Sequence, residues 1–151
     1  MDSSAAQQYR MIYDIYVLLD DGDRRVLRTF NLSTSQYNVL MLLDGERGWR
    51  LTDMSDRLLF DKSTVTRIID RLEQMELVRR LADSSDRRVQ RVLLTETGQS
   101  LRERAHAAHE HSMEQRLAVL DAEEQRCLQT LLGKLRDGLQ ADLHQDTTAD
   151  R

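Results

Sequence analysis

The chain has 151 residues, of which 40% are apolar and 32% are charged, and this composition fits one globular domain or two very small ones. Its 26 acidic and 22 basic side chains give a formal net charge of −4, which argues against a surface coated in positive charge. No apolar run approaches the roughly 18 residues of a membrane span, and residues 1–4 lack the pattern of a secretion signal. The single cysteine, Cys127, cannot form an internal disulfide, so we expect a cytoplasmic protein without membrane contact.

The first predicted element is a long helix over residues 5–30, which the absence of proline and the low glycine count favour. A polar interruption at residues 20–23 divides its apolar positions. These positions recur at roughly helical spacing and are Tyr9, Ile12, Tyr13, Ile15, Tyr16, Leu19, Val26, Leu27 and Phe30.

Three shorter helices are predicted next, each from a polar residue that can cap the helix N-terminus. Ser35 is the expected cap of the first, which ends near Gly45, and Thr52 is expected to open the second. Asp61 is the expected cap of the third, DKSTVTRIIDRLEQMEL, whose buried face centres on three apolar residues, Val65, Ile68 and Leu72.

Two β-prone runs follow, at residues 77–82 and 89–94, and the polar loop at residues 83–88 between them favours a hairpin. Three short helices and a hairpin predict a winged helix-turn-helix domain over residues 32–98. The predicted fold class is therefore mostly α with a small β-hairpin wing.

The remaining sequence predicts helices over residues 99–144 and a polar, frayed tail over residues 145–151. Asp121 is the expected cap of the last helix, and leucines at spacings of three and four mark its apolar stripe. The terminal helices (residues 5–31 and 99–144) cannot easily bury their stripes against a small middle domain. We therefore expect them to form an interlocked homodimer, with a monomeric bundle as the alternative.

The exposed face of the helix that follows Asp61 carries the side chains that a DNA major groove would accept. On a helical wheel, short hydroxyls lie near its N-terminus and arginines further along, and backbone N–H groups at this end can meet phosphates. Lys62 could contact a phosphate and Arg67 could bind guanine through two hydrogen bonds. The alternative is an ordinary amphipathic helix with a solvated polar face.

The hairpin favours nucleic-acid binding because its loop presents Arg87 and Arg88, and arginine on a narrow ribbon can enter a minor groove. Asp86 is expected to orient one guanidinium through a bidentate pair. Residues 62–91 hold eight basic and five acidic residues, a net charge of +3, so the rest of the chain carries −7. The acidic total therefore does not exclude DNA binding.

The ordered motifs LSTSQYNVLMLL, LTDMSDRL, DKSTVTRIIDRLEQMELVRR, DSSDRR and VLLTETG resemble those of the MarR family of bacterial transcription regulators, over about residues 32–101. The resemblance implies a cytoplasmic, nucleoid-associated homodimer that binds double-stranded DNA at a pseudo-palindromic operator, more often as a repressor than as an activator. With the reasoning above, it assigns DNA contacts to twelve residues: Ser35, Gln36, Thr52, Lys62, Ser63, Thr64, Thr66, Arg67, Arg71, Asp86, Arg87 and Arg88.

Two residues depart from the family pattern. Glu76 stands where the family commonly has glycine, and a left-handed backbone there would cost about 1 kcal/mol. Ser84 replaces a common proline of the wing, which should loosen the loop.

Members of the family often respond to small aromatic ligands bound between the dimer helices and the DNA-binding lobe. The candidate pocket residues here are Tyr9, Tyr13, Tyr16, Phe30, Tyr37 and Met41, with Trp49 beside them, although packing is the more frequent role of such side chains.

Other functional sites are less well supported by the sequence. Cys127 is expected to be a buried structural thiol. His106, His109 and His111, with Glu110 and Glu114, raise the alternative of a metal-responsive regulator, but an exposed polar face is the favoured interpretation. We find no catalytic motif and expect neither enzymatic activity nor a cofactor. A winged-helix protein-interaction module remains the alternative from another functional class.

Overall fold

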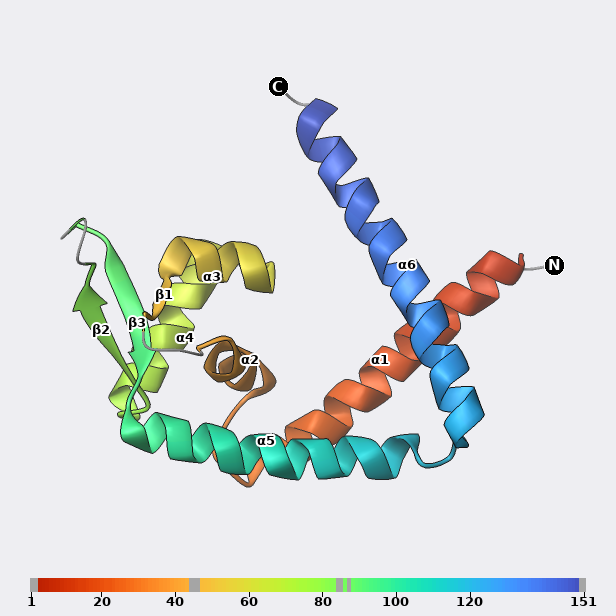
Figure 1. The fold of residues 1–151 in the computed structure, drawn as a ribbon, viewed down its shortest axis with the longest axis horizontal. Helices are drawn as coiled ribbons and strands as arrows, with labels where there is room; N and C mark the ends of the chain where they lie inside the picture. The colour runs from red at the N-terminus through yellow and green to blue at the C-terminus, as the bar shows by residue number, and fades with distance from the viewer. Residues whose placement is uncertain (1–2, 44–46, 84–85, 87, 150–151) are drawn as a thin grey trace. The chain divides into compact units, whose positions relative to one another are not determined.

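A computed structural model describes residues 3–43, 47–83, 86 and 88–149. The chain forms two compact units, Met1–Ser112 and Met113–Arg151. The first contains α1 (Ser4–Arg28), α2 (Thr34–Leu42), β1 (Trp49–Arg50), α3 (Leu51–Leu58), α4 (Lys62–Gln74), β2 (Val78–Ala82), β3 (Gln90–Leu94) and most of α5 (Glu96–Leu117) (Figure 1). The second contains the end of α5 and α6 (Ala122–Ala149). Within the described residues, no helix combines the length and apolar character needed to cross a membrane.

Helix α1 is continuous through the polar stretch at residues 20–23, which confirms the predicted long first helix. The acidic side chains of this stretch pair with arginines one turn later: Arg24 with Asp20 and Arg25 with Asp21, both at 2.7 Å. Such pairs at positions i and i+4 support a helix. A single glycine in the stretch costs about 1 kcal/mol, which does not break a helix of this length.

The caps of the short helices differ in part from the prediction. Ser33, not Ser35, caps α2: its Oγ accepts from the backbone N–H of Gln36, while Gln36 Oε1 accepts from the N–H of Ser33. This reciprocal arrangement is a capping box. Helix α3 begins at Leu51, so Thr52 lies inside it rather than opening it. The predicted Asp61 cap of α4 is confirmed, since its carboxylate accepts from the N–H of Thr64 at 2.8 Å.

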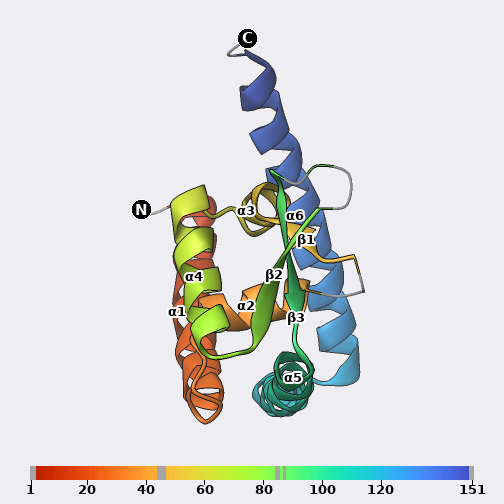
Figure 2. The same ribbon diagram turned by 90° about the vertical axis from the view of Figure 1, so that its left-hand side faces the viewer.

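The predicted hairpin is confirmed within one residue at the start of each strand. Strands β2 and β3 are antiparallel, with Val78 opposite Leu94 and Ala82 opposite Gln90. A third strand, β1, pairs with the other edge of β3 and completes a sheet of order β1-β3-β2. Figure 2 shows this hairpin beside α4, so the helix and the wing share one face of the first unit.

The core of the first unit lies where α1, α2, α3, α4, α5 and the sheet meet. Its fully buried side chains include Leu27, Leu40, Met54, Val65, Ile69, Leu72 and Val92. On α4 the buried face centres on Ile69, whereas Ile68 is only partly buried. Val65 and Leu72 are buried as predicted, and the third fully buried residue is Ile69 rather than Ile68.

The turn between α4 and β2 requires a left-handed residue. Glu76 occupies it with a φ of +59°, which confirms the conformation expected where the family has glycine. The N–H of Leu77 donates to the carbonyl of Leu72, and Thr95 Oγ1 donates to the Glu76 carbonyl at 2.7 Å. These bonds hold the turn although glutamate has a steric cost there.

In the second unit, the predicted Asp121 cap of α6 is confirmed: Asp121 Oδ1 accepts from the N–H groups of Glu123 and Glu124 at 2.8 and 2.9 Å. The helix runs to Ala149, past the point where a frayed tail was expected. Cys127 is exposed, so the expectation of a buried thiol is wrong for the single chain.

Candidate nucleic-acid interface

The N-terminus of α4 is organised around the carboxylate of Asp61. Ser63 Oγ donates to Asp61 Oδ1 at 2.5 Å and Thr64 Oγ1 donates to Oδ2 at 2.7 Å, in addition to the backbone bond that caps the helix. The Ser63 hydroxyl first, and then the hydroxyl and N–H of Thr64, hold the pKa of the Asp61 carboxyl well below its ordinary value. Since both hydroxyl protons point to Asp61, the two oxygens offer acceptors to an incoming group, which suits base amino groups better than phosphates.

Along the exposed face of α4, basic side chains lie free of carboxylates among the described residues. Lys62 is exposed, Arg67 donates to Thr64 Oγ1 at 3.3 Å, and Arg71 donates to Gln74 Oε1 at 3.4 Å. Thr66 Oγ1 donates to the carbonyl of Lys62 at 2.8 Å, leaving its oxygen as an acceptor. The face therefore combines unpaired cations with hydroxyl acceptors, as a major groove requires.

The three predicted contacts outside this helix and the wing have structural settings of their own. Gln36 is committed to its capping box, and its Nε2 donates to the sulfur of Met75 at 3.9 Å. Ser35 is half-buried in the first turn of α2. Thr52 is exposed at the start of α3, where its hydroxyl donates to Asp53 Oδ1 at 3.3 Å.

The wing has an exposed arginine near its loop, and arginines of the sheet below the loop form ion pairs. Arg88 is exposed, and its backbone N–H donates to Asp86 Oδ1 at 2.9 Å; Arg87 and Ser84 lie outside the described residues. Among the described residues, the almost fully buried carboxylate of Asp83 lies 2.5 Å from Nε of Arg91 in the wing and 3.3 Å from Nη2 of Arg50 in β1. Sequence reasoning did not single out Asp83, and the orienting role of Asp86 stays a prediction because Arg87 lies outside the described residues.

Arg80 is likewise tied to the body of the domain. Its guanidinium contacts Asp70 Oδ1 at 2.5 Å and also pairs with Glu73, so one wing arginine is held by two carboxylates of α4. Sequence reasoning had included Arg80 and Arg91 among the eight basic residues of residues 62–91 without predicting these ion pairs. The cations without a carboxylate partner among the described residues of this face are instead Lys62, Arg67, Arg71, Arg79 and Arg88.

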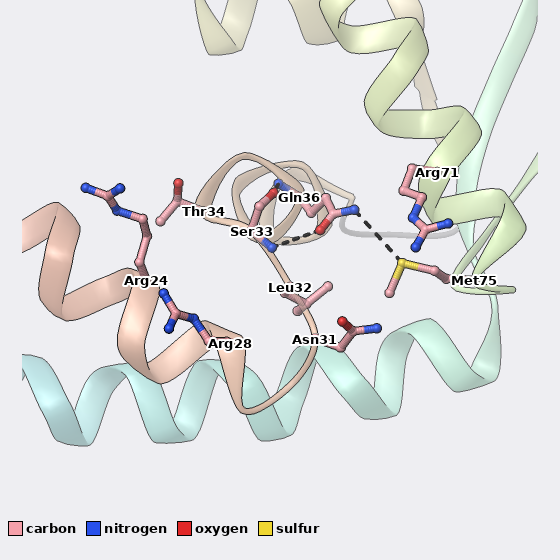
Figure 3. Close-up of a pocket in the computed structure, with 9 residues that line it drawn as sticks. All are labelled: Arg24, Arg28, Asn31, Leu32, Ser33, Thr34, Gln36, Arg71 and Met75. Carbon is pink, nitrogen blue, oxygen red and sulfur yellow. Dashed lines mark hydrogen bonds between the residues drawn. The ribbon is translucent and has the colours of Figure 1, made fainter.

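The side chains proposed for a ligand pocket lie in different surroundings in the described part of the chain. Tyr9, Tyr13 and Tyr16 are exposed on α1, whereas Phe30, Met41 and Trp49 pack against the core. A pocket of about 330 Å³ in the first unit lies between α1, α2 and α4 (Figure 3), and none of these side chains lines it. Its lining includes three arginines, of which sequence reasoning had named only Arg71 as a functional residue.

Tyr37 belongs to a buried polar group at the contact of α1, α2 and α5. Its hydroxyl lies 3.0 Å from His106 Nδ1 and 3.4 Å from His109 Nδ1, and His109 Nε2 lies 3.1 Å from Asp23 Oδ1. Burial first, and then the Asp23 and Glu110 carboxylates, raise the pKa of the Tyr37 hydroxyl. His109 is buried, so the expected exposed histidine face is wrong at this position. In the residues that the structure describes, no three metal-binding side chains gather into a site.

A helix with a polar N-terminal face, beside a hairpin with a basic tip, defines the winged helix-turn-helix class of DNA-binding domain (Figure 2). Comparison with known proteins agrees with this class and identifies the family. The MarR family model matches residues 32–89. The chain is 30% identical over 119 residues to YxaD of Bacillus subtilis (strain 168), an uncharacterized HTH-type transcriptional regulator, with 79% of this chain and 81% of the relative covered.

Solved structures give the same result. AbsC, a MarR family transcriptional regulator from Streptomyces coelicolor, superimposes with a TM-score of 0.81 at 26% identity, covering 93% of this chain and 98% of AbsC. A mutant of E. coli MarR complexed with operator DNA has a TM-score of 0.76 at 25% identity, covering 83% of this chain and 91% of that one. The chain belongs to the MarR family of transcriptional regulators, which bind DNA and are not enzymes.

Proposed function

We propose that the protein is a cytoplasmic repressor that binds a pseudo-palindromic operator as a homodimer and leaves it when a small effector binds. In this proposal α4 enters the major groove and the wing tip reaches the adjacent minor groove. The observation that carries the proposal is the face that α4 shares with the hairpin (Figure 2). On it, cations without carboxylate partners among the described residues accompany hydroxyl acceptors.

The individual contacts follow from the chemistry of each side chain. Arg67 projects from the exposed face of α4 and can donate two hydrogen bonds to guanine, whereas Ser63, Thr64 and Thr66 offer acceptors to base amino groups. Lys62, Arg71 and Arg88 are exposed cations suited to backbone phosphates or to the minor groove. Ser35, Gln36, Thr52, Asp86 and Arg87 complete the proposed set of DNA contacts.

Homodimer formation is supported by apolar faces that the single chain leaves exposed in both units. On α1 these include Ile12 (46% exposed) and Tyr16 (63%), and on α6 they include Leu131 (58%), Leu132 (50%) and Leu139 (57%). Such stripes on long helices favour burial against a second copy. Sedimentation of the wild-type chain should therefore give a dimer, and Leu132→Glu should shift it toward monomer, whereas the exposed Gln129→Glu should not.

The effector proposed is a small aromatic molecule, as the family resemblance implies. Support from the structure is indirect: Tyr9, Tyr13 and Tyr16 are exposed on the same helix as the proposed dimer face, so a second copy could enclose them. Repression is proposed from the family's usual mode of action.

Selection of bound fragments from the host genome, followed by salt titration on the fragments recovered, tests this function. We expect one enriched palindromic motif and an affinity that falls steeply with salt, because bound cations release counterions from the DNA. Failure to bind any duplex at low salt would contradict the proposal and favour a protein-interaction role.

A further inference from the structure

Leu59 lies in the short turn between α3 and α4, and its side chain is 82% exposed. Its neighbours Leu58 and Phe60 are partly buried and pack against the core of the first unit. The exposed apolar side chains of α1 and α6 belong to faces that a second copy is proposed to cover, but Leu59 lies on neither helix. One exposed leucine would need no explanation by itself, but the backbone that carries this one is unusual.

Leu59 has a left-handed backbone, with φ at +55° and ψ at +34°. Its N–H and that of Phe60 both donate to the carbonyl of Ser55, and this pattern of hydrogen bonds ends α3. Glycine is the usual residue at such a helix end, because the Cβ of an L-residue crowds the carbonyl oxygen that follows it. Leucine therefore has a steric cost here, and burial in the single chain does not offset it. A strained residue that the fold does not require is a candidate for a functional role.

The turn leads directly into the polar N-terminus of α4 (Figure 2). Asp61, the cap of this helix, follows Leu59 by two residues, and the hydroxyl groups that bind Asp61 come next. In helix-turn-helix domains, the N-terminal residues of the second helix contact base edges and the first helix crosses the DNA backbone. When α4 enters a major groove, the turn that joins it to α3 therefore lies close to the duplex.

The apolar surface that DNA offers to such a turn is of two kinds. In the major groove it is the C5-methyl group of thymine, which apolar side chains contact. Along the backbone it is deoxyribose, which is the same at every base pair and carries no sequence information. An uncharged leucine does not attract a phosphate, so its contribution comes from burying apolar surface against one of these groups. The N-terminus of a recognition helix lies in the groove, which favours the methyl group.

We propose that Leu59 is a specificity-determining residue that contacts the C5-methyl group of a thymine beside the base pairs that α4 contacts. The inference rests on the proposed function, because it requires α4 to enter a major groove. The apolar surface of Leu59 is exposed in the free protein and is buried only when DNA is bound. Replacing this leucine by glycine therefore has opposite effects on stability and on operator affinity.

The first experiment measures both quantities for full-length Leu59→Gly, with Glu76→Gly as the matched control. Both variants place glycine at an exposed, left-handed position, at opposite ends of α4. Both should raise the midpoint of urea denaturation, because the steric cost is removed. Leu59→Gly should weaken binding to the operator selected from the host genome about fivefold or more, whereas Glu76→Gly should leave it within about twofold. A lower midpoint for Leu59→Gly would show that the leucine stabilises the fold, and the argument for a DNA role would fail.

The second experiment replaces the thymines of the operator by uracil, one at a time. Uracil forms the same base pair and lacks only the methyl group. With the wild-type protein, uracil at one position of a half-site should weaken binding about threefold to fivefold. Leu59→Gly should bind the thymine and uracil duplexes equally, whereas Glu76→Gly should keep the difference. Leu59→Met retains apolar surface and should also keep it.

The outcomes separate this inference from the proposed function. If Leu59→Gly binds the operator as tightly as the wild type, or if every uracil effect persists in it, Leu59 does not contact a methyl group and the inference is wrong. If Leu59→Gly weakens binding while no uracil position affects the wild type, the leucine contacts deoxyribose and has no role in specificity. Failure of the wild-type protein to bind any duplex would overturn the proposed function and this inference together. Operator binding without a Leu59-dependent uracil effect would overturn this inference alone.

Discussion

The arginines of α4 and the wing fall into two groups, which differ in whether a carboxylate of the domain binds the guanidinium. Arg67, Arg79 and Arg88 are exposed and, in the described part of the chain, lack carboxylate partners, whereas Arg80 and Arg91 are held by carboxylates of the domain itself. A guanidinium already paired with a carboxylate has little net charge to offer to a phosphate. The first group is therefore suited to binding DNA and the second to fixing the wing on the domain.

The strongest test of this division removes the charge that anchors the second group. Asp83→Asn would leave Arg91 and Arg50 without their shared, buried carboxylate, and we expect it to lower the free energy of unfolding by about 2 to 3 kcal/mol. This loss is no larger than the usual cost of breaking a buried ion pair, because both arginines are partly exposed to solvent. Urea denaturation measures the loss.

Asp86→Asn is the control for that experiment, because Asp86 is exposed two residues before Arg88. It should change the free energy of unfolding by less than about 0.5 kcal/mol. Equal stabilities of the two variants would show that the Asp83 ion pairs do not hold the wing.

Within the exposed group, Arg67 and Arg88 should differ in the kind of DNA contact that each makes. Arg67→Ala should weaken binding to the selected operator by about 2 kcal/mol and relax the preference at one base pair, since a bidentate base contact is lost. Arg88→Ala should weaken binding by more than about 1 kcal/mol. Quantitative gel-shift titration on the operator and on single-base variants checks both, and unchanged affinity in both variants would contradict the assigned contacts.

A pair of adjacent residues compares the two groups most directly. Arg79 is exposed, whereas Arg80 is bound by Asp70 and Glu73. Arg80→Gln should cost about 1 kcal/mol of stability with little change in the salt dependence of DNA binding. Arg79→Gln should leave stability unchanged and reduce the salt slope by up to about one unit. Thermal melts and salt titrations of both variants would refute the division if they gave the reverse pattern.

Much of this fold follows from local signals in the sequence. The spacing of Val65, Leu72 and their neighbours predicts α4, Asp61 predicts its start, and the polar loop at residues 83–88 predicts the hairpin. The capping box of α2 also had a local signal, since Gln36 follows Ser33 by three residues, but the prediction chose Ser35. Strand β1 is only two residues long, which is too short for an alternating pattern.

The candidate site was less predictable because its charges are set by tertiary contacts. Arg80 meets Asp70 and Glu73 only after β2 folds back beside α4, and no spacing in the sequence reports that pairing. The burial of His109 had a weak signal, because Leu101, Ala105 and His109 recur every four residues on α5. The polar character of histidine favoured the opposite prediction.

Glu76 lies at the turn that joins α4 to β2. Its substitution tests whether the free energy of unfolding can change while operator affinity stays the same. Glu76→Gly should raise the free energy of unfolding by up to about 1 kcal/mol, because glycine adopts a φ near +59° without a steric penalty. Operator affinity should stay the same, since neither group of arginines changes. Chemical denaturation and gel-shift titration measure the two quantities, and a lower stability would show that the Glu76 side chain contributes more than its strain costs.

The smallest effect is expected at Asp61, which is exposed at the N-terminus of α4. Hydrogen bonds from Ser63 and Thr64 lower the pKa of this carboxyl below its ordinary value of 3.8. The carboxylate therefore stabilises the folded state fully above that value, and the contribution is lost as the pH falls through the lower folded-state pKa. Asp61→Asn keeps a capping side chain that does not titrate. The difference in Tm between wild type and Asp61→Asn should be constant near neutral pH and should shift against the wild type below about pH 4. A difference independent of pH would show that the hydrogen bonds from Ser63 and Thr64 do not depend on the charge of Asp61.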